Sequence, residues 1–487
     1  MSDRKKLWLW ILGILGVWLF VGVFIAGIPW RSAFERRVAE IQARGEPVCA
    51  ADLKPKTVPA EDNGGPLIEA IFRDINGYQG YKNAISLGLG GLKPEELRQL
   101  IQLEQAAIAK EKIEKAERVS LSPDGRKIQV KATAPLKAVK TASLTPAEQK
   151  KLDDAQKIRQ QYRDLTLLLS EQPDLLDRLE KALAKPHFHF SIEYKSPCWS
   201  NLLPHLGPCR QTCNLLVDLS RYYYAIGEPI LAQRCRLMLL RTPRMLNDEI
   251  FPISSLVRVA TTGIVCANLG EQFPCLSDAE LLEIQSSADK LEPWPKSWAQ
   301  MMIAERVAAV EAIQLRGTNI DELRSWVIGE EKWFWQIYFH TCLRYIDGLR
   351  CLREHDLIIA GNPTPPDKQL SYLGKHLLPG LDTIKTKLAI EAAKIRQFRL
   401  GLALELHKRK TGTYPADLSG FSLPAQDDEG KPMKYEVFNE GRGACLEFEI
   451  TTFGCFSCSG YLKRKSRIAH FGLGERPEKH PCGEQNK

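Results

Sequence analysis

The feature that most constrains this chain is an apolar segment near its N-terminus. Residues 7–28 form a run of 22 residues without a charged side chain. A helix of that length rises about 33 Å, which is enough to cross the hydrocarbon core of a bilayer. Trp8, Trp10 and Trp30 lie near the ends of the run, where indole rings favour the headgroup region. The sequence therefore predicts a transmembrane helix over residues 7–28, with the lipid bilayer as a partner.

A cleaved signal peptide is the alternative interpretation of this run. Signal peptides have an apolar stretch of about 7 to 15 residues and small side chains at the cleavage site. Here the run is longer, and it is followed by the bulky sequence Ile28-Pro29-Trp30. We therefore expect an uncleaved signal-anchor and a single-pass membrane protein.

The orientation cannot be taken from the basic residues, because they flank the run on both sides. All 13 cysteines lie after the run, and such enrichment is typical of an oxidising compartment. We therefore expect residues 1–6 in the cytoplasm and the bulk of the chain in the periplasm or outside the cell. An odd number of cysteines leaves at least one thiol free or paired with another chain.

The composition is that of a folded chain. Hydrophobic residues make up 44% and charged residues 26% of the 487 residues, which excludes an intrinsically disordered protein. Lys and Arg number 67 against 59 Asp and Glu. This excess is too small for the basic surface of a nucleic-acid binder, so we expect no nucleic-acid partner.

Helical periodicity dominates the chain after the predicted anchor. Residues 213–226 carry apolar side chains at three- and four-residue spacing, and Gly227-Glu228-Pro229 then reverses the chain into a second helix. This pattern predicts an αα-hairpin. After residue 412 the pattern changes to short β segments, such as residues 434–438 and 444–452. We expect a mainly α fold with an N-terminal transmembrane helix, an extracytoplasmic helical domain that contains the αα-hairpin, and a small C-terminal α+β module.

Composition shifts and the turn-forming residues Pro and Gly suggest the boundaries of the domains. The predicted order is a cytoplasmic N-terminus (1–6), the transmembrane helix (7–28), a membrane-proximal stalk (29–92), helices with a β-hairpin (93–190), a helical domain (191–359), a linker (360–380), a long helix plus a small β module (381–462) and a basic, polar tail (463–487).

Two stretches resemble known families. Residues 201–317, with NLLPHLGPCRQTCNLLVDLSRYYYAIGEPILAQRCRLMLL and the later ERVAAVEAIQLRG, resemble uncharacterised membrane-anchored helical proteins of planctomycete-type bacteria. Residues 394–435, with TGTYPADL and DDEGKPMKY, are similar to the end of the long helix and the start of the sheet in type II secretion pseudopilins (protein G-like domains). The second resemblance implies a component of a secretion or pseudopilin-like assembly, although the calcium loop of that family is replaced here by Gly-Cys-Phe-Ser-Cys.

Cys455 and Cys458 form the only C-x-x-C spacing in the chain. Thiol oxidoreductases and zinc sites both use this spacing, but an oxidoreductase would place the first Cys at a helix N-terminus after a strand. The surrounding sequence does not predict such a helix. We therefore favour structural disulfides over a metal or redox site for the group Cys445, Cys455, Cys458 and Cys482.

A second group of cysteines lies in the helical domain. Cys209 and Cys213 are four residues apart, and Cys198 lies upstream. Pairing of these residues with Cys235, Cys266 or Cys275 would link neighbouring helices, although spacing does not determine the connectivity.

His187 and His189 flank Phe188. On a strand both imidazoles would face one way and could hold a metal ion. No carboxylate or third histidine stands near them in the sequence to complete a site, so we expect an ordinary loop or edge strand and assign no metal site, cofactor or catalytic residue. The function that the sequence favours is a membrane-anchored structural or protein-interaction scaffold, which leaves open a protein partner in the cell envelope. The alternatives are the secretion assembly and a thiol oxidoreductase or metal-dependent enzyme at Cys455 and Cys458.

Overall fold

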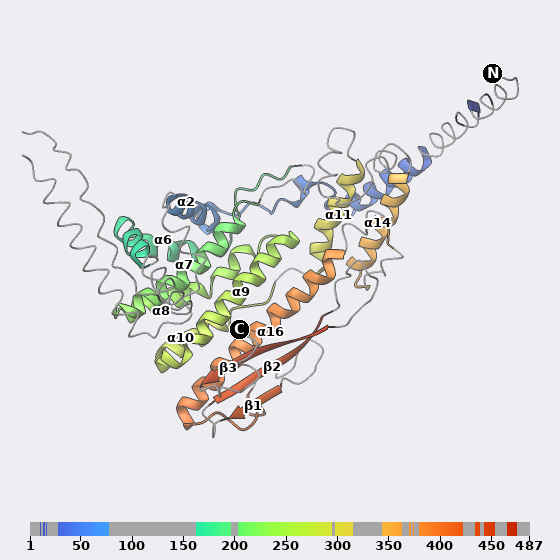
Figure 1. Ribbon diagram of the computed structural model, residues 1–487. Helices are drawn as coiled ribbons and strands as arrows, with labels where there is room; N and C mark the ends of the chain where they lie inside the picture. Colours follow the sequence, from blue (N-terminus) through green and yellow to red (C-terminus); the bar gives the residue numbers. More distant parts are fainter. Residues whose placement is uncertain are drawn as a thin grey trace, which may run out of the picture.

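A computed structural model of the chain is mainly helical (Figure 1). It describes residues 10, 13, 14, 16, 28–76, 162–195, 203–294, 298–314, 343–362, 370, 371, 374, 379–421, 434–438, 443–452 and 465–474. Within these residues the main helices are 28–43, α2 (Gly65–Asn76), 162–171, α6 (Leu175–Leu183), α7 (Leu206–Ala225), α8 (Pro229–Leu239), α9 (Pro252–Gln272), α10 (Asp278–Ala288), α11 (Trp298–Gln314), α14 (Leu343–Ile359) and α16 (Pro379–Thr411).

Helices α7 and α8 form the αα-hairpin that the sequence predicts. Gly227 has a φ of 86° in the turn between them, a backbone conformation that glycine adopts without a steric penalty. Pro229 begins α8, where its missing N–H leaves no intrahelical bond unmade. The two helices pack against each other, and α7 also contacts α9.

The largest core includes side chains of α7, α9 and α16, and α9 contacts both of the other helices. Leu219 of α7, Leu269 of α9 and Phe398 of α16 are all fully buried there. The ring of Phe398 lies 5.5 Å from that of Phe273, which follows α9. Helices α2, α6, α8 and α10 contribute further apolar side chains to the same core, so the centre of the molecule is a closely packed helical layer.

A buried ion pair crosses this core between α9 and α16. Arg258 Nη1 donates to Glu391 Oε1 at 2.5 Å, and both side chains are at most 1% exposed. The remaining guanidinium nitrogens donate to Pro243 O, Asn247 Oδ1 and Glu292 O. Glu391 accepts further bonds from the Thr262 hydroxyl and the Trp294 amide. Each charged group is therefore enclosed by partners.

One helix among the described residues, Pro252–Cys275, is long and apolar enough to cross a membrane. Half of its most apolar 18-residue stretch is buried inside the protein, and the helix carries the buried Arg258 that pairs with Glu391. Central helices of soluble folds have the same length and composition, so we assign this helix to the core. The predicted anchor, 7–28, lies almost wholly outside the described residues.

The region predicted as a stalk differs from that prediction in the part that the structure describes, 29–76. In helix 28–43, Phe34, Val38 and Ile41 are buried against α11 and α14 in a second core. In α2, the apolar side chains belong to the main core. The sequence predicts a short helix over residues 32–43 within this stalk, and its apolar side chains at three- and four-residue spacing give helix 28–43 a face that must be covered.

Three strands follow α16: β1 (Lys434–Phe438), β2 (Gly443–Thr452) and β3 (Lys465–Gly474). They form an antiparallel sheet of order β1-β2-β3, in which Tyr435 lies opposite Leu446 and Glu447 opposite His470. Helix α16 contacts β2 and β3, and Figure 1 shows the sheet beside its C-terminal half. The predicted β-hairpin around residues 119–130 lies outside the described residues.

Candidate metal centre

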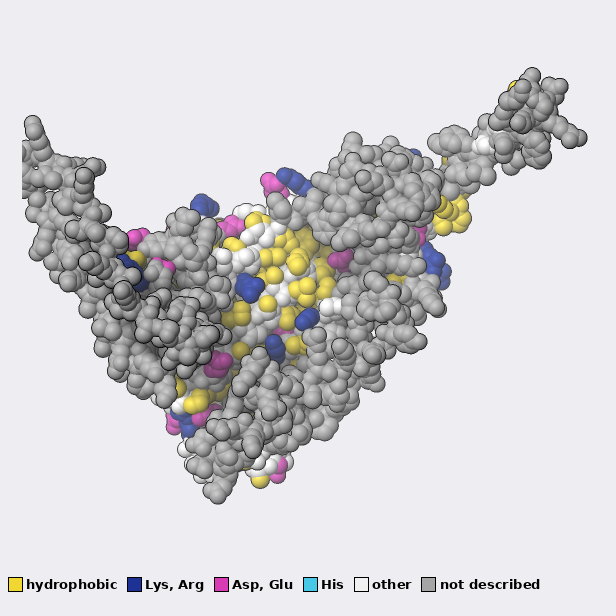
Figure 2. Space-filling model, in the orientation of Figure 1, with side chains coloured by type: hydrophobic (Ala, Val, Ile, Leu, Met, Phe, Trp, Pro, Cys, Tyr) yellow, Lys and Arg dark blue, Asp and Glu magenta, His cyan; other side chains and the backbone are white. Residues whose placement is uncertain are grey.

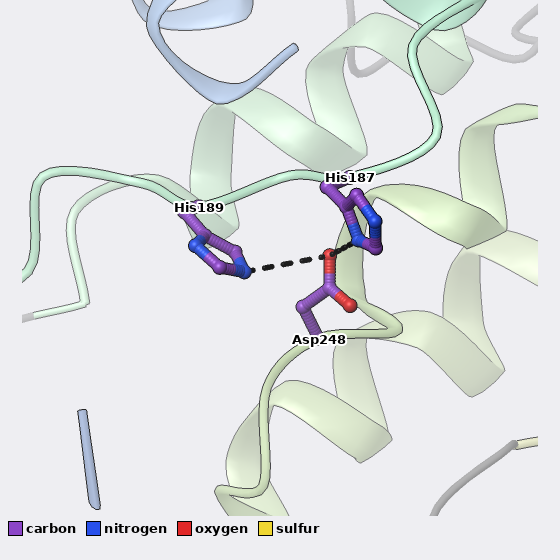
Figure 3. A group of neighbouring side chains, drawn as sticks. All are labelled: His187, His189 and Asp248. Carbon is purple, nitrogen blue, oxygen red and sulfur yellow. Dashed lines mark ion pairs between the residues drawn. The ribbon is translucent and has the colours of Figure 1, made fainter. Parts of the chain in front are cut away.

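The structure brings His187, His189 and Asp248 together at the surface of the helical body (Figure 3). Their potential ligand atoms all lie within 4.8 Å of one another. Asp248 Oδ2 is 3.4 Å from His187 Nδ1 and 3.9 Å from His189 Nε2. Both imidazoles thus point to the same carboxylate oxygen, which comes from a segment about sixty residues further along the chain.

The two histidines share a face because their segment is extended. His187 forms a parallel bridge with Asn63, and the amide of Gly64 donates to His187 O at 2.8 Å. The amide of His189 donates to Asn63 Oδ1, also at 2.8 Å. Alternation along extended backbone then places both imidazoles on one side and Phe188 on the other, where Phe188 is 1% exposed in the core.

Asp248 lies in a turn between η4 (Thr242–Leu246) and α9. Its Oδ2 accepts a hydrogen bond of 2.9 Å from the backbone amide of Phe188. The carboxylate is therefore held by the same extended segment that presents the two histidines. This hydrogen bond holds the turn beside the extended segment without the help of a metal ion.

The next residue in the turn is anchored below the surface. Glu249 pairs with His205, with 2.5 Å between His205 Nε2 and Glu249 Oε1, and both side chains are buried. Glu249 also accepts a hydrogen bond from the Ser254 hydroxyl. The ring of His205 stacks on Phe190 at a centroid distance of 4.4 Å. This buried pair joins the turn to both the extended segment and the start of α7, so the position of Asp248 is supported from two sides.

The donor set suits a divalent transition metal. Imidazole nitrogens bind zinc at about 2.0–2.1 Å and carboxylate oxygens at about 2.0–2.2 Å, so ligand atoms around a tetrahedral ion are about 3.3 Å apart. The separations of 3.4 and 3.9 Å are close to that value, and small side-chain rotations would bring the donors together. Two imidazoles and one carboxylate also match the donors that Fe(II) accepts.

The group is partly open to solvent. The side chains of His187, Asp248 and His189 are 44%, 23% and 17% exposed. Three protein donors with an accessible side leave a coordination position for water or another ligand, whereas structural zinc sites are closed by four protein ligands. The arrangement can therefore hold an ion that exchanges its remaining ligands.

The cysteines predicted to link helices are free thiols. Cys209 and Cys213 are buried and unbridged, and so are Cys235 and Cys266, while Cys275 is free and exposed. Burial raises the pKa of the Cys213 thiol to about 12, so it stays protonated, and its Sγ lies 3.8 Å from Thr261 O. The prediction of disulfide staples at Cys209 and Cys213 is wrong for this structure, because these side chains fill the core as small apolar groups.

The remaining predicted cysteine sites are not tested. Cys198, Cys455, Cys458 and Cys482 lie outside the described residues, and only the backbone of Cys445 is described, in β2. The C-x-x-C motif and its disulfide, zinc and redox interpretations thus stay predictions.

On the sequence alone, His187 and His189 are considered together but assigned no metal site. His187 and His189 were recognised as side chains that could face one way, but Asp248 was not connected with them. The only signal for it is the polar sequence Asn247-Asp248-Glu249 between two helical segments. Polar turns of this kind are common on protein surfaces, and their sequence does not predict which residues they contact.

Comparison with known proteins finds no relative whose site could be compared with this one. No protein-family model, no curated protein and no solved structure matches the chain.

Proposed function

We propose that this chain is a single-pass membrane-anchored scaffold protein whose helical body binds a divalent transition-metal ion, with zinc as the probe of choice, through His187, His189 and Asp248. The convergence of three potential ligand atoms within 4.8 Å carries the proposal. The atoms come from two segments far apart in the sequence. The hydrogen bond from Phe188 to Asp248 and the buried pair beneath the turn hold those segments in place.

The ion would act first as a clamp. It would join the extended segment 187–191 to the turn before α9, two parts of the surface that otherwise meet through hydrogen bonds and a His–Asp contact. Its accessible side would accept a further donor from water or from a protein partner in the envelope. A scaffold with one exchangeable coordination position can make its interactions depend on metal supply, and this is the role that we propose.

The anchor is residues 7–28, as the length of the uncharged run supports. The proposed orientation, with residues 1–6 in the cytoplasm and the bulk periplasmic or extracellular, rested on cysteine enrichment. Seven of the 13 cysteines are free thiols, so cysteine enrichment supports an oxidising compartment only through the other six. Thiol labelling with a membrane-impermeant maleimide in intact cells, aimed at the exposed Cys275, would test the orientation.

A second candidate is a component of a secretion or pseudopilin-like assembly. The long helix α16 ends at Thr411, and Gly412 follows with a φ of 90°. The hydroxyl of Tyr414 then donates to Glu405 at 2.6 Å, and that of Tyr435 donates to Pro415 O at 2.8 Å. These bonds fasten the turn and β1 to the end of the helix. A long helix that leads through such a turn into an antiparallel sheet supports the C-terminal α+β module and its pseudopilin-like character as a proposal.

The third candidate, a thiol oxidoreductase or metal-dependent enzyme at Cys455 and Cys458, gains no support from the described residues. It nevertheless shapes the experiment, because cysteine pairs bind zinc strongly. The metal proposal is therefore tested in the full chain with Cys455 and Cys458 replaced by Ser.

The test is equilibrium dialysis of this detergent-solubilised protein against buffered zinc, with the bound metal measured for each polypeptide. We expect one ion, and we expect Asp248→Asn to lose it while keeping an oxygen that accepts from the Phe188 amide. His407→Ala is the matched control, because His407 is also partly exposed but lies on α16 beside Phe421. Equal zinc binding by the Asp248→Asn and His407→Ala variants would refute the proposed centre.

A further inference from the structure

The start of helix 28–43 leaves no room for a spacer between the predicted span and the folded body. Ile28, the last residue of the uncharged run, is 68% exposed, whereas Phe34 is 1% exposed. The six residues from Ile28 to Phe34 correspond to about 9 Å of helix rise. Residues 28–43 are one helix. If residues 7–28 cross the bilayer, the second core therefore begins within about two turns of the hydrocarbon.

Helix α14 runs in the same direction as helix 28–43. The ring of Phe34 lies 6.0 Å from that of Tyr345 in the first turn of α14. Further along both helices, Arg37 Nη2 donates to Asp356 at 2.5 Å. The beginnings of the two helices are thus at the same end of the body (Figure 1).

Exposed apolar side chains are concentrated at this end. Ten large apolar side chains are exposed in the part of the chain that the structure describes. Three of them, Trp10, Ile14 and Ile28, belong to the predicted span itself, and Trp30, Leu343 and Ile346 lie at the start of helix 28–43 and in the first turn of α14. Figure 2 shows apolar side chains at this end of the body. Isolated exposed apolar residues need no explanation, but their concentration beside a predicted span does.

The exposed face of α14 changes character along its length. Leu343 and Ile346, in the first turn, are 44% and 37% exposed; Arg350 and Arg353 follow on the same exposed face, and Leu357, 41% exposed, lies beyond them. Arg31 and Arg36 are exposed on helix 28–43. Apolar side chains at one level and arginines one or two turns further out match the order of acyl boundary and anionic headgroups at a bilayer surface.

We propose that this end of the body, formed by the first turn of α14 and the start of helix 28–43, rests on the headgroup region of the bilayer. The inference relies on the proposed anchor and goes beyond it. The anchor alone would allow the body to stand away from the membrane on a stalk. In the proposed arrangement Leu343 and Ile346 form a second lipid contact, and it fixes the tilt of the helical body relative to the membrane.

The test uses the full chain in nanodiscs that contain anionic lipid. An environment-sensitive fluorophore is attached through an azide-bearing amino acid incorporated at position 346, and quenching by a headgroup spin-labelled lipid is measured. The matched control carries the same fluorophore at position 282. Leu282 is 55% exposed and belongs to α10, which lies far from the N-terminal projection in Figure 1. Both labelled proteins must retain the denaturation midpoint of the unlabelled chain.

We expect quenching at position 346 several-fold above that at position 282, together with a blue-shifted emission. Equal quenching at the two positions, in protein that still floats with vesicles, would overturn the lipid contact and leave the anchor intact. Quenching at neither position, in protein that fails to float with vesicles, would overturn both the anchor and the contact.

Discussion

Two polar clusters in this molecule join segments far apart in the sequence, and they differ in how completely they are enclosed. Arg258 and Glu391 meet in the main core, where both are at most 1% exposed and surrounded by hydrogen-bond partners. His187, His189 and Asp248 meet at the surface with one side accessible. The partners around the first cluster enclose it completely, whereas the second cluster offers three potential metal-ligand atoms on an accessible side. A buried group whose polar atoms all have hydrogen-bond partners can stabilise the fold, whereas a group with an accessible side can bind an ion.

The enclosed pair has a cost as well as a benefit. Burial raises the pKa of the Glu391 carboxyl above its ordinary value and lowers the pKa of the Arg258 guanidinium. The loss of hydration thus outweighs the attraction between the two charges. Such a pair adds little net stability compared with apolar side chains of the same size, yet removing one partner leaves a buried charge without compensation. This asymmetry gives the largest effect that we predict.

Replacing Glu391 by Ala should lower the free energy of unfolding by about 3–5 kcal/mol, because Arg258 would remain buried without its carboxylate. Urea denaturation followed by circular dichroism measures this loss. The double variant Arg258→Met with Glu391→Leu is the control, and it should recover much of the lost stability. If Glu391→Ala cost no more than a surface substitution, the pair could not be enclosed as described.

His355 provides the histidine counterpart of the enclosed cluster. It is fully buried in α14, and its Nδ1 is 2.8 Å from Cys351 O. Burial lowers its pKa to about 4. Between pH 6.5 and 4 the unfolded chain therefore binds a proton that the folded chain refuses, and stability falls as the pH is lowered through this window.

A shift of this size corresponds to about 3 kcal/mol, since each pKa unit is about 1.36 kcal/mol. Urea midpoints measured from pH 7 to pH 4 should fall more steeply for the natural chain than for the His355→Gln variant. The comparison between the two proteins removes the contribution of the carboxylates that titrate in the same range. Parallel curves would show that His355 does not stay neutral in the folded state.

Zinc should stabilise the folded chain through the open cluster. A ligand that binds only the folded state at a free concentration one hundred times its dissociation constant adds about 2.7 kcal/mol to the free energy of unfolding. Urea denaturation of the Cys455→Ser, Cys458→Ser protein with and without zinc measures the effect. The His189→Ala variant should lose it and the His407→Ala variant should keep it. A zinc effect of the same size in both variants would place the ion elsewhere.

The smallest effect is expected for Asp248→Asn in the absence of metal. The amide oxygen can still accept from the Phe188 backbone, and Asp248 is 23% exposed, so the free energy of unfolding should change by no more than about 0.5 kcal/mol. The same change should abolish zinc binding. A large loss of stability without metal would instead make the His–Asp contacts a structural feature, as in the enclosed pair.

Much of the fold follows from patterns that are local in the sequence. The turn at Gly227 and Pro229 predicted the hairpin of α7 and α8, since glycine and proline fix the backbone there. The helix that ends before Gly412 was predicted in the same way. The packing of residues 29–76 against the body does not follow from local patterns. What covers Phe34 and Ile41 comes from α11 and α14, hundreds of residues away, and no local pattern reports that packing.

The metal centre shows the same limit on a smaller scale. Alternation along one extended segment was enough to pair His187 with His189. Asp248 reaches them only because its turn is fixed by the Phe188 amide and by the buried pair of His205 and Glu249. The disulfides predicted at Cys209 and Cys213 are not formed in the structure, for a related reason. Count and spacing suggested disulfides, whereas burial in the core makes Cys209 and Cys213 apolar filling.

X-ray absorption at the zinc edge, on the full chain with Cys455 and Cys458 replaced by Ser and loaded with one equivalent of zinc, tests the central claim most directly. The account predicts a first shell of nitrogen and oxygen only, at about 2.0–2.2 Å, with the outer-shell scattering typical of two imidazoles. A first shell that contains sulfur at about 2.3 Å would place the ion at cysteines and contradict the proposed centre. A spectrum without imidazole scattering would contradict it equally.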